Sequence, residues 1–217
     1  MTKLCIFDLD GTILNTLTTI AYYGNNALSA YGIQPIDEED YKLLIGKGIV
    51  NLIKNMLNFR NCMSDENFEK VFQHYDTAYN ADTSYLTTPY AGIPEMLNAI
   101  KEKGISMAIV SNKPHFATTG VVNAIFGENY FDLVYGQREG IPIKPDPTAV
   151  IEVMEHFGVT PEECLYVGDT GTDMKTGKNA NIYTLGVLWG FRGKEELVQN
   201  GADAIIDHPL QLLECIR

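Results

Sequence analysis

Short runs of consecutive apolar residues, rich in β-branched and aromatic side chains, recur along the chain at residues 4–7, 105–110, 133–135, 165–167 and 182–189. A strand that is solvated on one face alternates apolar and polar residues, whereas a strand covered on both faces reads as a continuous apolar run. The runs therefore predict strands of a sheet that is buried on both faces.

Segments with helical spacing of apolar residues lie between these runs, at residues 93–103, 115–126 and 147–157, and a further helix is expected after Gly171. A glycine directly follows each of the first three segments, and glycine is common just past the end of a helix. Strands that alternate with helices form a parallel sheet with right-handed crossovers. The sequence thus predicts an α/β fold, a doubly wound parallel sheet of the Rossmann-like type.

One long interruption separates the first run from the others, because residues 14–90 carry helical periodicity and no convincing strand. Such a length is not expected of a loop. Its apolar spacing predicts a helix that ends near Gly32, a second over residues 43–57 around a break at 45–48, and a third over 68–79. We therefore expect a catalytic core of residues 1–14 and 88–217 and an inserted helical domain of residues 15–87. The proline and glycine of residues 87–92 are typical of a hinge.

Composition narrows the possible partners. Hydrophobic residues make up 45% of the chain and charged residues 20%, as in ordinary globular proteins. The 28 acidic residues exceed the 16 Lys and Arg residues, for a formal net charge of −12. That charge repels nucleic acids and anionic membrane surfaces, so neither is an expected partner. It also repels a phosphorylated ligand, so a phosphate site would need cations, a metal ion or backbone N–H groups close by.

The four cysteines form no CxxC pair, and two of them lie in apolar, strand-like runs where cysteine packs as a small hydrophobe. Reduced thiols and a cytoplasmic location are the expectation. The run at residues 4–7 is shorter than the apolar region of a secretory signal. No stretch approaches the roughly 18 apolar residues of a membrane span.

Polar side chains gather where the predicted strands end. They are Asp8 and Asp10, Ser111 and Asn112, Lys144, and Asp169 with Asp173. In open α/β sheets, ligands bind in the crevice beyond the carboxyl ends of the strands, so one shared site is the simplest expectation. Carboxylates are hard oxygen ligands of the kind that Mg²⁺ prefers.

Each group also has an ordinary structural interpretation. Asp8 and Asp10 leave their strand on the same side, but a DxD turn can equally cap a helix. Ser111 and Asn112 could donate to a phosphoryl oxygen at a helix start, and they are also preferred N-cap residues. A lone lysine such as Lys144 is usually solvated, although an ammonium held rigidly over a phosphate would neutralise it.

Taken together, the motifs resemble those of the haloacid dehalogenase-like hydrolase superfamily in order and spacing. They are DLDGT at residues 8–12, Ser111-Asn112-Lys113, Lys144-Pro145, and GDTGTD at residues 168–173. The helical insertion resembles the four-helix cap of that superfamily, and the subgroup that the chain most resembles is the phosphoglycolate phosphatases. The resemblance extends across essentially the whole chain. It implies a Mg²⁺-dependent phosphatase that hydrolyses small phosphomonoesters through an aspartyl-phosphate intermediate.

The resemblance also implies a role for each matching residue. Asp8 would be the nucleophile, and Asp10 the general acid that protonates the leaving oxygen and the base that later activates water. Ser111 and Lys144 would bind the phosphate, with Asn112 as an additional polar contact.

The same resemblance implies the metal ligands and their neighbours. Mg²⁺ would be held by Asp8, the carbonyl oxygen of Asp10, and Asp169. Thr12 would orient Asp10, and Asp173 would act through a water molecule. In the insertion, Lys47 could meet a substrate carboxylate or could equally be a surface lysine.

Alternative functions share parts of this pattern. A phosphomutase of the β-phosphoglucomutase type has every core motif and would return the phosphoryl group to a sugar. A dehalogenase needs neither a second aspartate nor a metal, so Asp10 argues against it. A non-enzymatic phosphoacceptor module of the receiver type also gathers carboxylates, Mg²⁺ and a lysine, but is usually shorter. The expected partner is a small phosphorylated metabolite, and the sequence leaves the oligomeric state open. Arg192 is expected to be solvated.

Overall fold

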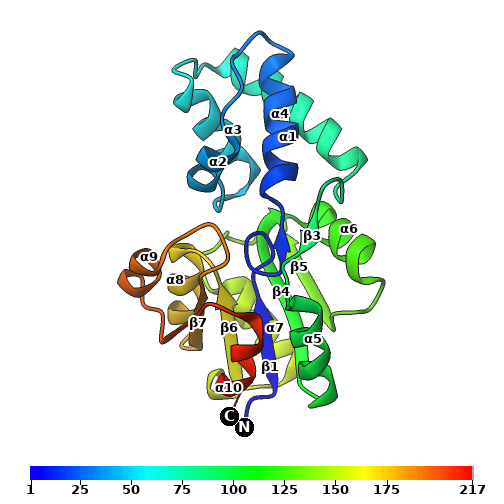
Figure 1. Cartoon of the computed structure of the whole chain (residues 1–217), viewed down its shortest axis with the longest axis vertical. Helices are drawn as coiled ribbons and strands as arrows, with labels where there is room; N and C mark the ends of the chain where they lie inside the picture. Colours follow the sequence, from blue (N-terminus) through cyan, green and yellow to red (C-terminus); the bar gives the residue numbers. More distant parts are fainter. Residues whose placement is uncertain (217) are drawn as a thin grey trace.

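Six parallel strands form the central sheet, in the order β5-β4-β1-β6-β7-β8 (Figure 1). The computed structural model describes residues 1–216. The chain places β4 and β5 on one side of β1, and then β6, β7 and β8 on the other, so the strand order reverses beside β1. The doubly wound parallel sheet predicted from the apolar runs is confirmed. The strands are β1 (Leu4–Phe7), β4 (Ser106–Pro114), β5 (Leu133–Gln137), β6 (Cys164–Gly168), β7 (Tyr183–Val187) and β8 (Ala204–Ile206).

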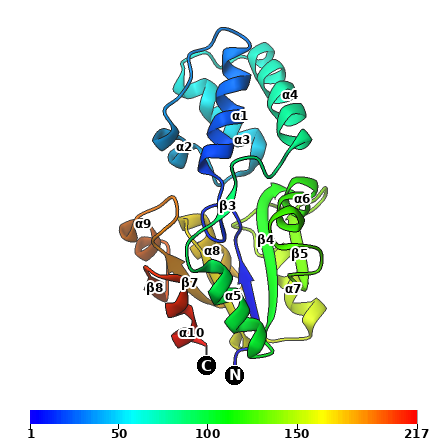
Figure 2. The same cartoon turned by 45° about the vertical axis from the view of Figure 1, so that its right-hand side comes forward.

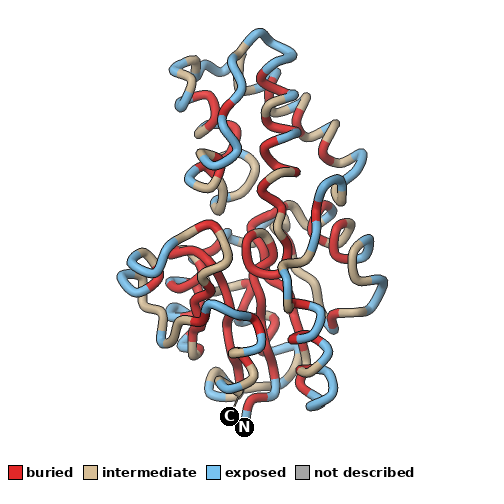
Figure 3. Tube along the Cα trace, in the orientation of Figure 1, coloured by how far each residue is buried: buried red, intermediate tan, exposed pale blue. Residues whose placement is uncertain are grey.

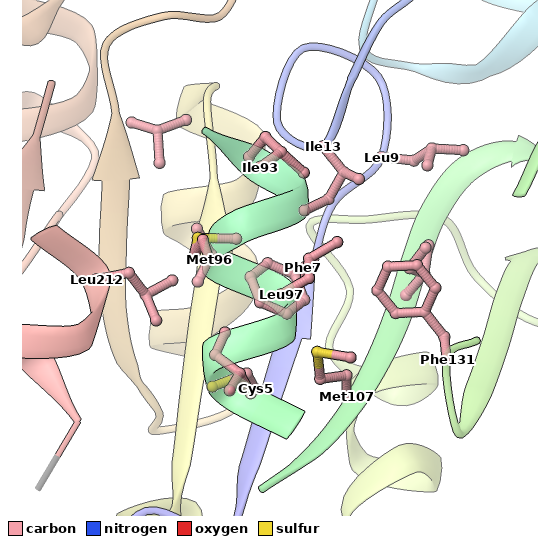
Figure 4. Close-up of a cluster of buried hydrophobic side chains, with 14 of the residues drawn as sticks. Cys5, Phe7, Leu9, Ile13, Ile93, Met96, Leu97, Met107, Phe131 and Leu212 are labelled. Atoms are coloured by element: carbon pink, nitrogen blue, oxygen red, sulfur yellow. The ribbon is translucent and has the colours of Figure 1, made fainter. Parts of the chain in front are cut away.

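Helices cover both faces of the sheet. Alternate residues of a strand point to opposite faces, so Cys5 and Phe7 of β1 pack in one buried cluster and Leu4 and Ile6 in another. The first cluster includes α5, which Figure 4 shows lying across β1, and the second includes α7. The flanking helices are α5 (Ile93–Glu102), α6 (His115–Phe126), α7 (Thr148–Phe157), α8 (Gly171–Asn179), α9 (Lys194–Gln199) and α10 (Leu212–Cys215), with short 3₁₀ turns at Pro161–Glu163 and Pro209–Gln211.

Four further helices form a group that lies beyond the carboxyl ends of the strands (Figures 1 and 2). They are α1 (Leu17–Ser29), α2 (Glu38–Leu44), α3 (Gly48–Phe59) and α4 (Asp65–Ala81). Their apolar faces share a buried cluster of their own, which Ala117 and Phe191 join from the sheet-containing part. We call residues 15–87 the helical insertion. No helix within residues 1–216 is long and apolar enough to cross a membrane.

The chain enters and leaves the helical insertion side by side. β2 (Leu14–Asn15) and β3 (Thr88–Pro89) pair as short antiparallel strands, which the sequence pattern did not predict. The hydroxyls of Thr19 and Thr87 lie 2.8 Å apart and are hydrogen-bonded to each other just above this pair. Most residues from β1 through this crossing to the base of α1 are buried, although Asn15 is half-buried and Thr88 is exposed (Figure 3).

Other boundaries differ from the sequence prediction for physical reasons. β4 runs to Pro114, so Ser111 and Asn112 lie within a strand and not at a helix start. The helix predicted over residues 43–57 is two helices, because positive φ angles at Gly46 (118°) and Gly48 (79°) turn the chain between them. The edge strand β8 and the helices α9 and α10 were not predicted, since each is too short to carry a clear periodic pattern.

Candidate active site

The polar residues at the strand ends converge on one cleft. Asp8 directly follows β1 and Asp169 directly follows β6, while Ser111 lies in the last part of β4. Because β1 pairs with both β4 and β6, the ends of these three strands are adjacent. The loop before α7 adds Lys144. The cleft has a volume of about 720 Å³, part of it open to solvent, and lies between the sheet and the helical insertion.

Lys144 supplies a buried cation beside Asp8. Its Nζ donates to Asp8 Oδ1 at 2.7 Å and to Asp173 Oδ1 at 2.8 Å, and the residue is only 4% exposed. Burial by itself would lower the pKa of the Lys144 ammonium, but the carboxylates of Asp173 and Asp8 outweigh it and raise that pKa. The group therefore stays charged at neutral pH.

Three buried carboxylates form the floor of the cleft. Asp8, Asp169 and Asp173 each place an oxygen within 4.8 Å of the others. Burial raises the pKa of Asp8 to about 7, and the charge of Asp173 adds to that rise while Lys144 opposes it. Burial, together with Asp173 and Asp8, raises the pKa of Asp169 well above its ordinary value.

The charges on this floor do not balance. With Asp10 included there are four carboxylates, and the two ammonium groups that contact them, those of Lys144 and Lys113, leave two negative charges when all are ionised. A divalent cation that prefers hard oxygen ligands would neutralise them. The donor set therefore fits Mg²⁺.

Two hydrogen bonds hold Asp169 in place. The Thr12 hydroxyl donates to Asp169 Oδ1 at 3.0 Å, and the Phe191 N–H donates to Oδ2 at 2.8 Å. The prediction that Thr12 orients Asp10 is thus wrong. Gly11 turns the backbone with a φ of 89°, and the Thr12 hydroxyl reaches the end of β6 instead. A Cβ at Gly11 would lie 2.3 Å from Asp169 Oδ2, so only glycine permits this close approach.

Asp173 contacts Lys144 directly and lies in the first turn of α8. Its Oδ2 accepts from the Thr170 hydroxyl at 2.6 Å and from the Thr170 N–H at 3.1 Å, in a reciprocal cap at the start of the helix. Its Oδ1 accepts from Lys144. Asp173 thus fixes the ammonium that lies beside Asp8, while the water-mediated metal contact stays a prediction.

Ser111 and Asn112 differ in what they can offer a phosphate. Ser111 Oγ accepts from the Lys113 N–H at 3.2 Å, which leaves its own hydrogen available for a ligand oxygen. The Asn112 Nδ2 donates to the carbonyl oxygens of Gly46 at 3.0 Å and Lys144 at 3.1 Å, while Oδ1 accepts from the Lys144 N–H at 2.8 Å. Both amide hydrogens are used, so the structure corrects the predicted phosphate contact of Asn112: this side chain positions the Lys144 loop.

Lys113 is a site residue whose role the sequence analysis missed. Its Nζ donates to the two carboxylate oxygens of Asp10 at 2.9 and 3.1 Å and lies 4.9 Å from the ring centroid of Tyr79 in α4. Burial opposes the charge on Lys113, but Asp10 outweighs it and the pKa of Lys113 is raised. The signal was present, because Lys113 directly follows Asn112 as the last residue of the second motif.

The helical insertion contributes a largely apolar half of the cleft, from residues including Ile20, Ile45, Ile49 and Leu52, together with Tyr75, Asp76, Tyr79 and Asn80 of α4. Lys47 is exposed and is not among the lining residues, although its neighbours Gly46 and Gly48 are. The structure therefore places Lys47 at the surface and not in the cleft.

Arg192 is not solvated as predicted. Its guanidinium donates to the carbonyl oxygens of Lys42 and Ile45 in the helical insertion and pairs with Glu196 at 3.2 Å. The arginine ties the loop after β7, which also holds Asp169 through Phe191, to the last turn of α2 and the residue that follows it.

The chain is similar in sequence to several known proteins. The family model described as haloacid dehalogenase-like hydrolase matches residues 5–187. A phosphoglycolate phosphatase of Aquifex aeolicus is 33% identical over 87% of this chain and 86% of its own length. An N-acetylmuramic acid 6-phosphate phosphatase of Pseudomonas aeruginosa is 29% identical over 99% of this chain and 94% of its own length.

Solved structures share the fold over nearly the whole chain. A candidate phosphoglycolate phosphatase from Lactobacillus delbrueckii subsp. bulgaricus is 30% identical with a TM-score of 0.93, over 100% of this chain and 99% of its own. A β-phosphoglucomutase from Clostridium difficile has a TM-score of 0.76 at 23% identity, over 98% and 93% of the two chains. At that identity the likeness to the mutase concerns the fold alone.

Proposed function

Because the chain belongs to the haloacid dehalogenase-like hydrolase family, we propose that it is a Mg²⁺-dependent phosphatase that hydrolyses small phosphomonoesters through a phosphoaspartate formed on Asp8. The observation that carries the proposal is the floor of the cleft. There a buried carboxylate, Asp8, lies 2.7 Å from the Lys144 ammonium and beside two further buried carboxylates.

In the first half-reaction, an oxygen of Asp8 attacks phosphorus and the ester bond to the leaving group breaks. Asp10 donates a proton to the departing oxygen. Ser111 and Lys144 hold the phosphoryl oxygens, and the Lys144 charge compensates the negative charge that develops there. Mg²⁺, held by Asp8, the Asp10 carbonyl oxygen and Asp169, would add a second source of positive charge at those oxygens.

In the second half-reaction, Asp10 takes a proton from a water molecule as that water attacks phosphorus. The bond between phosphorus and Asp8 breaks, which releases inorganic phosphate and restores the Asp8 carboxylate. We propose that the helical insertion, residues 15–87, covers the floor during these steps and limits the access of bulk water. The sheet-containing part, residues 1–14 and 88–217, then carries all the reacting groups.

The experiment that tests this function replaces the nucleophile. Asp8→Asn keeps the size of the side chain but removes the attacking charge. We expect kcat for p-nitrophenyl phosphate to fall at least about 1000-fold, because the covalent route is lost. The folded state should persist, as judged by circular dichroism. Activity within tenfold of the unsubstituted protein would refute covalent catalysis.

Product analysis separates the remaining alternatives. With a hexose 1-phosphate as substrate, free phosphate is the expected product, and accumulation of an isomerised hexose phosphate would identify a mutase. Stoichiometric labelling without steady release of phosphate would identify a phosphoacceptor module. Omission of Mg²⁺ with a chelator should abolish turnover, and its return should restore it.

A further inference from the structure

The half of the cleft that faces away from the reacting groups carries no positive charge from the helical insertion. Among the described lining residues, Asp76 is the one charged side chain that the insertion contributes. The rest of that wall is apolar or neutral. A leaving group must lie against this wall when its phosphate occupies the floor.

The lysines of the cleft are already engaged. Lys144 donates to Asp8 and Asp173, and Lys113 donates to both oxygens of Asp10. Lys47, the insertion lysine nearest in sequence to the lining, is exposed outside the cleft. A carboxylate on the leaving group would therefore meet Asp76 without a cation to pair with it, which is unfavourable at a partly buried site.

The polar groups of α4 are suited to hydroxyl groups instead. Asn80 Nδ2 donates to Asp76 Oδ1 at 3.0 Å, which leaves Asp76 Oδ2 and the Asn80 carbonyl oxygen as acceptors. The residues are one helical turn apart and both line the cleft.

Tyr79 provides an independent observation that points to a ligand. It is 4% exposed, and the polar group beside its hydroxyl is the Lys113 ammonium, although no hydrogen bond of ordinary geometry forms within residues 1–216. The Lys113 ammonium lies over its ring, so the side chain has a fixed position at the cleft. Buried hydroxyls are normally hydrogen-bonded, and an ammonium can only donate, so the hydrogen of the Tyr79 hydroxyl has no acceptor within residues 1–216 and calls for one on a ligand in the cleft.

We propose that the substrate is a phosphomonoester of a neutral polyhydroxy alcohol or sugar, without a carboxylate on the leaving group, and that Asp76 of α4 determines this specificity. The inference rests on the proposed phosphatase function and specifies its substrate class. Hydroxyl groups of the leaving group donate to Asp76 and Asn80 and meet the Tyr79 hydroxyl, while the apolar residues contact the carbon chain.

A matched pair of substrates tests the proposal. D-Glucitol 6-phosphate and 6-phospho-D-gluconate differ only in a terminal CH₂OH or carboxylate. For the unsubstituted protein we expect kcat/KM to favour the glucitol ester by at least tenfold. Asp76→Asn removes the charge and keeps the shape, and should narrow that ratio about tenfold, mainly through faster hydrolysis of 6-phosphogluconate. Glu69→Gln is the matched control, because Glu69 is an exposed acid of the same helix outside the cleft.

The outcomes separate this inference from the phosphatase function. Without turnover of p-nitrophenyl phosphate, the proposed function itself fails. With such turnover, a preference for 6-phosphogluconate, an unchanged ratio in Asp76→Asn, or hydrolysis of neither six-carbon ester overturns the inference alone. If Lys47→Ala specifically loses 6-phosphogluconate hydrolysis, Lys47 binds the substrate carboxylate, and this result would also overturn the inference. A tenfold preference for 2-aminoethyl phosphate over 2-hydroxyethyl phosphate would also overturn the inference, because it would show that Asp76 selects a leaving group with an ammonium and not a neutral one.

Discussion

Lys113→Met tests a buried contact between Asp10 and the helical insertion. Lys113 is 8% exposed, bonds both oxygens of Asp10 and supports the ring of Tyr79. Methionine keeps most of the side-chain length and removes the charge. The substitution therefore leaves Asp10 without its cation while the packing around the chain changes little.

The geometry sets the size of the effect. Two unit charges about 3 Å apart attract by about 5 kcal/mol at an effective dielectric constant of 20. Desolvation of the ammonium offsets part of that attraction, and removal of one partner from a buried pair usually costs about 3 to 5 kcal/mol. The Asp10 side chain keeps 14% of its exposure, and water in the cleft can solvate it. We therefore expect Lys113→Met to lower the free energy of unfolding by about 3 kcal/mol, the lower end of that range.

A double-mutant cycle in urea unfolding measures the pair itself. Lys113→Met, Asp10→Asn and the double variant should give a coupling energy of about 2 kcal/mol, with the double variant more stable than Lys113→Met. Lys178→Met is the matched control, since Lys178 pairs with Asp203 at the surface and should cost less than about 1 kcal/mol. A coupling energy below about 0.5 kcal/mol would refute the claim that the Lys113–Asp10 contact stabilises the cleft.

Further predictions concern the proposed metal site. Because the folded-state pKa of Asp8 is raised to about 7, protonated Asp8 stabilises the metal-free protein at acid pH, and that stability is lost as the pH rises from about 4 through about 7. Mg²⁺ competes with this proton, so the increase in Tm caused by Mg²⁺ should be larger at pH 8 than at pH 5. Equal increases at the two pH values would contradict the proposal that Asp8 is a Mg²⁺ ligand. Gly190→Ala should weaken Mg²⁺ binding at least about tenfold in calorimetry, since its Cβ would lie 2.3 Å from Asp169 Cβ and 2.4 Å from the Gly11 carbonyl oxygen. Gly193→Ala, whose Cβ would meet its first neighbour at 3.5 Å, is the control and should bind Mg²⁺ normally.

The parts of the fold that sequence could predict are those in which one local pattern determines the outcome. β1 was predicted at its observed bounds because both of its faces are covered, which makes every residue apolar. The length of β4 was not predictable in the same way, since Ser111 to Pro114 are polar or lack a donor and continue the strand beside β5 with a shifted register. Pairing with β5 determines where β4 ends, and the pattern of apolar residues within β4 does not indicate which strand pairs with it.

The sequence could predict that the site residues converge, because they follow apolar strands that are recognisable from local pattern. It could not predict the hydrogen bonds between them. Asp8 and Asp169 follow strands that are neighbours in the sheet, so strand order alone brings them together. Thr12 was assigned to Asp10, two residues away in sequence, but its partner Asp169 lies across the gap between β1 and β6. Proximity in sequence suggested Asp10 as the acceptor for the Thr12 hydroxyl, whereas the fold brings Asp169 within hydrogen-bond distance.

Two consecutive residues of β4 connect the sheet side of the cleft to the helical insertion. Asn112 holds both the Lys144 loop and the carbonyl oxygen of Gly46, and Lys113 holds both Asp10 and the ring of Tyr79. One strand therefore positions reacting groups on the sheet side and the helical insertion on the other. Residues of α4 that are not in these contacts, such as Asp76, can change without displacing Asp8 or Lys144. Substrate choice and phosphoryl chemistry are thus separable at Asp76, because its hydrogen bond is to Asn80 of the same helix and not to a group that positions Asp8 or Lys144.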